Sequence, residues 1–298
     1  MEQPTSSQPG EQATGTSTKI IKSSGDLKQL LKTLDSLPTK PPSIYLDVSS
    51  SNQEELLNLQ LLVLPTNEIY VVDIKSLGTT ALSVVGEEGE FQSLRLVLES
   101  KTIAKVGFDI RDMSRLLFHQ FNVSLSGMYD LQLMELASRE QGKSKKFLSG
   151  LAKCIDIDVP STDGTKLRWL QPDATTNMYM FNSLGHAPNR SIRRVEMFPV
   201  LWKVYRRRLG KPGEAFWLAE ARCESQERAE RPKSDSASPY GRHIGPGMWW
   251  DRERREAAID SWNDILLMEI RVGHWKLNDD AEWVPDHSRD NEDWLFDS

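Results

Sequence analysis

The sequence predicts an α/β protein in which helices flank a mixed β-sheet, and three observations lead to this class. Short apolar runs typical of strands occur at 43–48 (SIYLDV), 57–64 (LNLQLLVL) and 68–74 (EIYVVDI). The turn sequence Pro65-Thr66-Asn67 makes the second and third of these runs antiparallel neighbours. A fourth run at 102–108 is followed by helical patterns, as in a mixed sheet covered by helices.

The composition is that of a protein with a sizeable core. Of 298 residues, 38% are apolar and 27% are charged, and this balance excludes a mostly disordered chain. No run approaches the roughly 20 apolar residues of a membrane span, and the first residues lack the regions of a signal peptide. Two cysteines, Cys154 and Cys223, cannot form a disulfide framework. We therefore expect free thiols and an intracellular protein, in the cytoplasm or nucleus, with no membrane association.

The N-terminal region divides into a tail, a short strand and a helix. Residues 1–18 hold almost no large apolar side chains, so we expect a disordered tail. Ile20 and Ile21 then indicate a short strand. The following leucines recur at helical spacing until Pro38 ends the helix, and they are Leu27, Leu30, Leu31, Leu34 and Leu37.

Helical patterns dominate the rest of the chain. Helices are predicted at 112–120, 130–139, 147–155, 191–208 and 250–269. A stretch rich in Ser, Pro and Gly marks residues 229–248 as a linker. The remaining residues, 249–298, carry 14 acidic and 6 basic side chains and six tryptophans. We expect them to form a mainly helical or irregular C-terminal appendage.

Asp47 is the most informative single residue. It lies at the end of an apolar strand, where a carboxylate needs a partner if it is buried. Strand-end capping into the Ser49-Ser50-Ser51 turn and a functional role both remain open on spacing alone. The sequence contains no phosphate-binding loop motif, no nucleophile elbow and no pair of histidines at metal-binding spacing.

Several stretches resemble one family in its own order and spacing. They are SIYLDVS, LVLPTNEIYVVDIKSLG, TIAKVGFDIRDMSRLLFHQFNV, YDLQLMELASR, GLAKCI and VEMFPVLWKVY. The chain resembles the DEDD-type 3′–5′ exonuclease domain, similar to ribonuclease D and to fungal exonuclease-domain proteins. The resemblance implies a ribonuclease H-like mixed sheet flanked by helices over 19–228. It also implies hydrolysis of nucleotides from a 3′ end by two divalent metals that four acids hold.

Three of these four acid positions carry other residues in this sequence. The resemblance places Asp47 at the first position and Ser49 at the second, where the family has Glu. It places Met113 and Arg194 at the two remaining acidic positions. Asp112 is adjacent to Met113, but neighbouring helical side chains point about 100° apart, which makes it a poor substitute.

The remaining polar residues of these motifs allow further predictions. Asp109, at the end of its strand, is the other acid that could replace the one lost at 113, and Arg190 takes the place of a family Tyr. Arg194 adds a positive charge that would repel metal ions. We expect it to pair with Asp47, which is then the only retained metal ligand. Asp130 and Gln132 match a family phrase that is structural.

These correspondences predict a catalytically degenerate nucleic-acid-binding protein, a pseudoenzyme that needs no cofactor. Arg190, Arg193 and Arg194 are the candidates for phosphate contacts with RNA or single-stranded DNA. One alternative is an active nuclease that uses Mg²⁺ or Mn²⁺ with displaced acids, Asp47 and Asp112 among them. Another is a protein–protein interaction scaffold, with a protein partner bound through the C-terminal appendage. The tryptophans of the appendage could stack on bases, but helical spacing favours packing against the domain.

Overall fold

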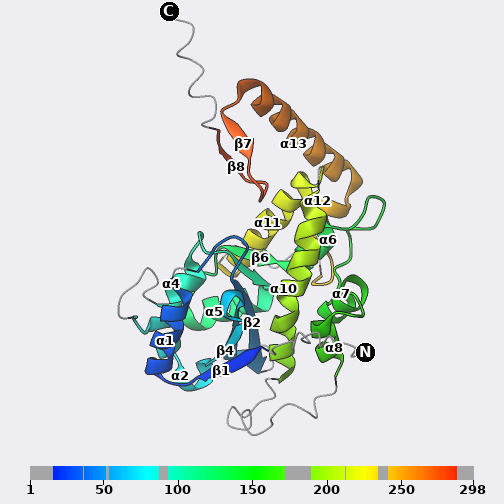
Figure 1. Cartoon of the computed structure of the whole chain (residues 1–298). Coiled ribbons are helices and arrows are strands. Elements are labelled where there is room, and N and C mark those ends of the chain that lie inside the picture. Colours follow the sequence, from blue (N-terminus) through cyan, green and yellow to red (C-terminus); the bar gives the residue numbers. More distant parts are fainter. Residues whose placement is uncertain are drawn as a thin grey trace, which may run out of the picture.

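The computed structural model describes residues 16–35, 37–51, 54–86, 93–171, 189–211, 213–233 and 241–286. A six-stranded sheet with strand order β1-β4-β3-β2-β5-β6 forms its centre (Figure 1). The strands are β1 (Ser17–Ile21), β2 (Ile44–Ser51), β3 (Glu55–Val63), β4 (Glu68–Asp73), β5 (Lys105–Gly107) and β6 (Met128–Asp130). The sheet begins at Ser17, so the predicted tail boundary at residue 18 is two residues too late.

The sheet is mixed, as the sequence predicts. Strands β2, β3 and β4 are antiparallel neighbours, whereas β1 joins β4, and β5 joins β2 and β6, in parallel. The predicted turn between β3 and β4 is a short 3-10 helix (Leu64–Thr66) that ends at Asn67 in the left-handed conformation, with φ of 51°. Asn tolerates this conformation better than most residues do.

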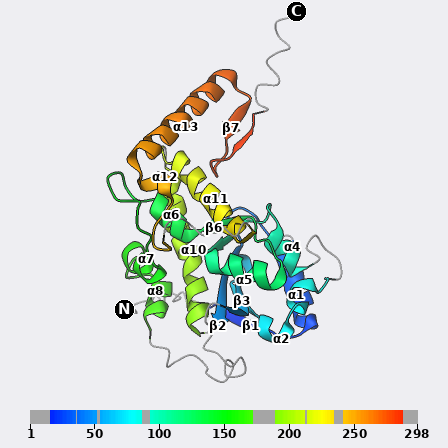
Figure 2. The same cartoon turned by 180° about the vertical axis from the view of Figure 1, so that it is seen from behind.

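Helices cover both faces of the sheet, each over its own hydrophobic core. The helices on the first face are α1 (Ser24–Leu34), α2 (Ile74–Leu77), α3 (Thr80–Ser83), α4 (Leu94–Glu99) and α5 (Arg111–Phe121). Figure 2 shows α1, α2 and α5 together beside the sheet. The helices on the second face are α6 (Leu131–Ala137), α7 (Leu151–Asp158), α10 (Asn189–Leu209) and α11 (Ala215–Glu230). A further short helix, α8 (Gly164–Leu170), packs beside α10.

The long helix α10 positions most of the site described below. Its buried side chains are Val195, Met197, Phe198, Leu201, Tyr205 and Leu209, and they pack against β2 and β3. Their spacing of three to four residues gives one apolar face, which is why this helix could be predicted. Arg194, near its start, contacts Asp47 of β2, whereas Arg206, near its end, lines a pocket with Tyr129 of β6.

The predicted linker is in part a component of the domain. After the short 3-10 helix Arg231–Lys233, the described chain resumes at Gly241 and packs on the domain. Ile244 forms a β-bridge with Phe147, and Gly245 donates a hydrogen bond to the carbonyl of Lys146. The region is a linker in the prediction, but its described part, 241–248, is a docked segment.

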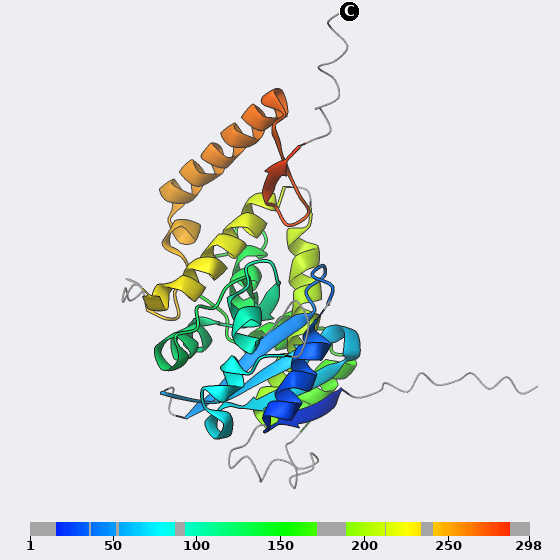
Figure 3. The same ribbon diagram turned by 90° about the vertical axis from the view of Figure 1, so that its left-hand side faces the viewer.

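The C-terminal region contains two helices and a hairpin. They are α12 (Gly247–Trp250), α13 (Arg252–Val272), β7 (Trp275–Leu277) and β8 (Trp283–Pro285), with β7 and β8 antiparallel (Figure 3). The hairpin was not predicted. Trp249 is fully buried, and Trp262 meets Phe216 of α11 edge to face, so these tryptophans pack against the domain as predicted. No helix in the described part of the chain is long and apolar enough to cross a bilayer.

Candidate functional site

The predicted pairing of Asp47 with Arg194 is present. Asp47 lies in β2 on the face that α10 covers, and Arg194 lies in the first turns of α10. Arg194 Nε donates to Asp47 Oδ2 at 2.6 Å. The Asp47 side chain is 9% exposed and that of Arg194 is 36% exposed, so the pair is open to solvent on the arginine side only. The distance is that of a charge-assisted hydrogen bond.

A cluster of neutral polar side chains continues from this pair along the same face of the sheet. Asp47 is opposite Gln60 of β3, and Ser49 is opposite Asn58. Ser49 Oγ donates to Asn58 Oδ1 at 2.9 Å, and Gln60 Nε2 donates to Ser49 Oγ at 2.9 Å and also to Asn58. Gln60 is fully buried, and its Oε1 accepts no hydrogen bond within the described chain. We call Ser49, Asn58 and Gln60 the amide cluster.

Sequence reasoning did not identify Asn58 and Gln60. The signal was available, because both are polar residues two positions apart in an otherwise apolar strand, LNLQLLV. Residues two apart on a strand face the same side. Two polar residues on the covered face of an otherwise apolar strand therefore indicate a site. Asp47 and Ser49 form the same pattern on β2.

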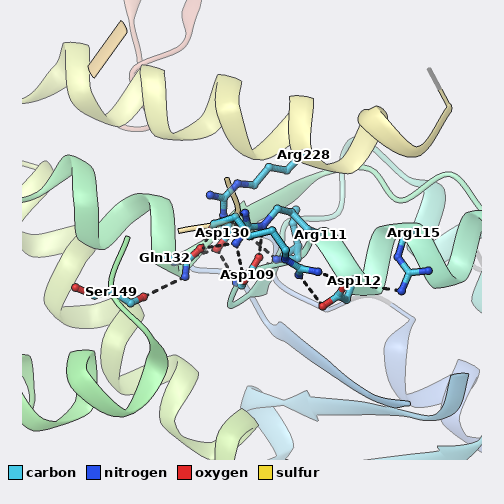
Figure 4. Close-up of polar contacts among 10 residues, drawn as sticks. Asp109, Arg111, Asp112, Arg115, Asp130, Gln132, Ser149 and Arg228 are labelled. Carbon is cyan, nitrogen blue, oxygen red and sulfur yellow. Dashed lines mark hydrogen bonds and ion pairs between the residues drawn. The ribbon is translucent and has the colours of Figure 1, made fainter. Parts of the chain in front are cut away.

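Met113 and Asp112 make contacts other than with this pair. Met113 is buried in the core on the first face of the sheet, with α1, α4 and the rest of α5. Both carboxylate oxygens of Asp112 accept hydrogen bonds from Arg242 of the docked segment, at 3.0 and 2.7 Å (Figure 4). Within the described residues, no three acidic, histidine or cysteine side chains come together as a metal-binding group.

A second buried ion pair lies where β5 and β6 end. Arg228 of α11 donates to Asp130 Oδ2 at 2.6 Å, and the two side chains are 4% and 0% exposed. The Asp130 carboxylate also accepts backbone N–H hydrogen bonds from Asp109, Ile110 and Gln132 at 2.9 to 3.1 Å (Figure 4). We call Asp109, Asp130 and Arg228, with their partners Arg111 and Gln132, the Asp130 network. Asp130 and Gln132 thus contribute to structure, as predicted.

Asp109 belongs to this network and not to the Asp47 pair. Its backbone is left-handed, with φ of 52°, and this turns the chain from β5 directly into α5. Arg111 donates from Nε and Nη2 to the two Asp109 carboxylate oxygens at 2.5 and 2.7 Å. Asp109, which the sequence suggested as a replacement metal ligand, is therefore paired with Arg111.

The two aspartates experience opposite electrostatic effects. Burial raises the pKa of Asp47, and the charge of Arg194 opposes this increase without cancelling it. Burial is also the largest single effect on Asp109 and favours its neutral form. The hydrogen bonds from Arg111, together with the charges of Arg111, Arg228 and Arg242, outweigh burial and hold the pKa of Asp109 below its ordinary value. The cost of burying the carboxylate is therefore less fully compensated at Asp47 than at Asp109.

The remaining predicted phosphate ligands lie on the same turns of α10. Arg193 is partly exposed, and its Nη1 donates to the backbone carbonyl of Gln171 at 2.5 Å. Arg190 lies in the first turn of α10, but its side chain is outside the described residues. The structure therefore places Arg194 on Asp47 of β2, with Arg193 next to it on α10.

Comparisons with known proteins identify the fold. No family model matches the sequence, and no curated protein matches it either. Among solved structures, ribonuclease D from Trypanosoma brucei in its GMP complex matches with a TM-score of 0.55 at 14% identity, covering 82% of this chain and 72% of that one. The same enzyme alone gives 0.55 at 14% identity, with 82% of each chain covered.

A third structure, the complex of Trypanosoma brucei ribonuclease D with RNA U12, gives a TM-score of 0.54 at 14% identity, with 81% of this chain and 78% of that chain covered. At this identity the likeness concerns the fold. The chain has the α/β fold of a ribonuclease H-like exonuclease domain, a mixed six-stranded sheet flanked by helices.

Proposed function

We propose that this protein binds nucleic acid with an exonuclease-type fold whose catalytic centre is degenerate. The observation that carries the proposal is the 2.6 Å ion pair between Arg194 and Asp47. The guanidinium of Arg194 occupies the position at which the resemblance implies a metal-binding carboxylate. It neutralises the one acid that the sequence retains, so attraction for a divalent cation is lost.

The other side chains around the pair support the same conclusion. Two divalent metals need several anionic oxygen ligands, because Mg²⁺ and Mn²⁺ prefer carboxylates. Ser49 is neutral and hydrogen-bonded within the amide cluster, Met113 is a buried thioether, and the Asp112 carboxylate is held by Arg242. These residues do not fit a two-metal centre, and we derive no catalytic step through one.

Nucleic-acid binding is supported by charge and by the fold neighbour. Trypanosoma brucei ribonuclease D was solved with RNA U12. Arg193 and Arg194 are adjacent on α10, and their guanidinium groups offer charged donors to phosphate oxygens. Arginine contacts to phosphate carry affinity without sequence information. We infer single-stranded nucleic acid as the ligand, held by its backbone at the Asp47 end of β2.

A trimming assay tests the catalytic part of the proposal. A 5′-labelled oligouridine is incubated with the protein and Mg²⁺ or Mn²⁺, beside an Asp47→Asn variant that keeps the size of the side chain. We expect no ladder of shortened products from either protein. Shortening by the native protein that disappears in Asp47→Asn would identify an active nuclease and overturn the degenerate assignment.

A binding titration tests the nucleic-acid part and separates it from a scaffold role. Fluorescence anisotropy of labelled oligouridine is recorded at several salt concentrations. Phosphate contacts make the logarithm of the affinity fall linearly with the logarithm of the salt concentration, with a slope of about −0.7 per contact on a single strand. Measurable, salt-dependent binding is the expected result. If the native protein binds no oligouridine even at low salt, the scaffold alternative is favoured instead.

A further inference from the structure

A separate pocket lies at the other end of α10. It has a volume of about 600 Å³ and lies between the chain before β2, the start of β6, and helices α10 and α11. Its charged and aromatic lining includes Lys40, Tyr129, Trp202, Arg206 and Arg222. Arg206 follows Arg194 by twelve residues, which is about 18 Å along a helix. The pocket is therefore distinct from the site around Asp47.

Basic and aromatic side chains from several segments line this pocket, together with acidic side chains of the C-terminal hairpin. The Tyr129 and Trp202 rings meet edge to face at 5.1 Å, and the guanidinium of Arg222 lies 5.5 Å from the Tyr129 ring. Lys40 approaches from the loop before β2, and Arg206 from the last turns of α10. Lys101 also lines the pocket, so four cations converge on one volume. Two of them are arginines, which suit the geometry of phosphate oxygens.

The turn between β7 and β8 covers three of these cations with acidic side chains. The Asp280 carboxylate lies 2.6 Å from Lys40 Nζ and 3.6 Å from Arg206 Nη2. Glu282 pairs with Arg222, and Arg206 also donates to the backbone carbonyl of Asp279. Figure 3 shows the hairpin reaching back from α13 toward α10 and α11. We call residues 278–282 the acidic turn.

The acidic turn is held chiefly by charge. The residues of the two strands that carry it are exposed or half-buried, and Trp275 is 45% exposed. Ala281 is its buried apolar contact, and this residue has a φ of 56°, which is unfavourable for alanine. Asn278 hydrogen-bonds the acidic turn internally, through Asp280 N and Glu282 N. Salt and competing anions weaken contacts of this kind more than they weaken apolar packing.

We propose that this pocket binds a chain of phosphate groups, and that the acidic turn occupies it as an internal competitor. Carboxylates at 279, 280 and 282 present closely spaced negative charges to the cations that would otherwise hold phosphates. The aromatic walls add a surface for a sugar or a base. A nucleic-acid strand and a free polyphosphate share this chemistry. The inference goes beyond the proposed function, because the pocket lies at the other end of α10 from the Asp47 pair.

The test removes the competitor and leaves the pocket intact. The variant Asp279→Asn/Asp280→Asn/Glu282→Gln is titrated at low salt with inorganic tripolyphosphate and, separately, with labelled oligouridine. We expect about tenfold tighter binding than in the native protein for at least one probe, because anionic contacts in the pocket are no longer contested. A gain for both probes assigns the pocket to a strand, and a gain for tripolyphosphate alone assigns it to free polyphosphate.

A matched control separates this effect from net charge. The variant Glu253→Gln/Asp260→Asn/Asp264→Asn removes the same charge from exposed positions of α13, away from the pocket. It is expected to change both affinities by less than about twofold. If the acidic-turn variant binds both probes no more tightly than this control, the inference is wrong.

A second variant tests the pocket itself. Adding Lys40→Gln, Arg206→Gln and Arg222→Gln to the acidic-turn variant removes the cations that the acidic turn contacts, and the tenfold gain is expected to disappear. A gain that survives would place the phosphates elsewhere. If the triple acidic-turn variant does not unfold cooperatively, Asp280→Asn alone releases Lys40 and Arg206 and serves the same test. The native protein's own binding of oligouridine, and the reduced salt dependence of that binding in Arg193→Gln, report on the proposed function separately.

Discussion

Asp130 with Arg228 and Asp47 with Arg194 are two carboxylate–arginine pairs that join a strand to a helix at the same distance of 2.6 Å. The Asp130 carboxylate also accepts three backbone N–H groups, and neither partner is more than 4% exposed. For Asp47, by contrast, the pairing arginine is 36% exposed and the neighbouring amide cluster leaves Gln60 Oε1 without a donor.

The difference separates a structural ion pair from one that can serve a ligand. A carboxylate whose hydrogen bonds are all made within the chain gains nothing from an external partner. Removing its arginine leaves a buried charge unpaired. A half-open pair keeps donor capacity on its arginine, which a phosphate can use. The Asp130 network therefore holds α11 in place, whereas the Asp47 pair remains accessible.

The largest expected effect is on stability. Arg228→Met leaves the Asp130 charge buried and is expected to lower the free energy of unfolding by about 3–5 kcal/mol. Arg194→Met, at the more exposed pair, is expected to lower it by about 1 kcal/mol. Urea unfolding followed by tryptophan fluorescence measures both. Equal losses of unfolding free energy in the two variants would mean that the two ion pairs contribute equally to stability.

Two serines provide a smaller version of the same comparison. Ser225 is fully buried, accepts the Asp130 N–H at 3.0 Å and donates to the Ala221 carbonyl. Ser225→Ala leaves a buried donor unpaired and is expected to cost about 1–3 kcal/mol. Ser49→Ala, at the half-buried member of the amide cluster, is expected to cost about 1 kcal/mol or less. Urea unfolding measures the loss of stability in both variants. A larger loss for Ser49→Ala than for Ser225→Ala would contradict the comparison.

The pH dependence of stability is expected to differ in sign at the two sites. The lowered pKa of Asp109 stabilises the folded state above the ordinary carboxyl value of about 4, and this contribution is lost as the pH falls through that value toward the lowered pKa. The raised pKa of Asp47 acts in the opposite direction, because its contribution decreases as the pH rises above about 4.

Asparagine variants measure the two contributions. Asp109→Asn is expected to lose less stability than the native protein on acidification from about pH 6 to about pH 3.5, and Asp47→Asn to lose more. Asn also tolerates the left-handed backbone at position 109. Urea midpoints at several pH values provide the data. Parallel curves for the native protein and Asp109→Asn would contradict the role given to Arg111.

The smallest effect concerns salt. Arg193→Gln, beside the Asp47 pair, is expected to reduce the salt slope of oligouridine binding by about 0.7, the value of one phosphate contact on a single strand. Arg115→Gln on α5, next to the Asp130 network, is the matched control and is expected to leave the slope unchanged. Anisotropy titrations distinguish the two variants, and equal slopes in all three proteins would remove Arg193 from the interface.

The sequence was most informative where local pattern and tertiary structure agree. Strands β2 to β4 and helix α10 follow clear periodicities, and the pairing of Arg194 with Asp47 follows from the need to compensate a buried carboxylate. Helix α11 was not predicted because its apolar residues form no single stripe. Its buried positions include the polar Ser225 and Arg228, which only a tertiary partner explains.

The contacts of Asp112 and the acidic turn could not be predicted for a related reason. Arg242 lies 130 residues after Asp112, in a stretch whose composition is that of a linker. Strands β7 and β8 have only three residues each, which is too short for a periodic pattern to be recognised. In both cases the structure depends on charged contacts between distant segments, and such contacts leave no periodic signal in the sequence.

The left-handed backbone at Asp109 has one more consequence. A residue in this conformation next to a right-handed one turns successive N–H groups toward a common point, and such a concavity can cradle an anion from solution. Here the N–H groups of Asp109 and Ile110 both donate to Asp130. The chain has supplied its own anion to this cradle, so recognition of an outside phosphate at the β5 end must rely on flexible side chains and not on the main chain.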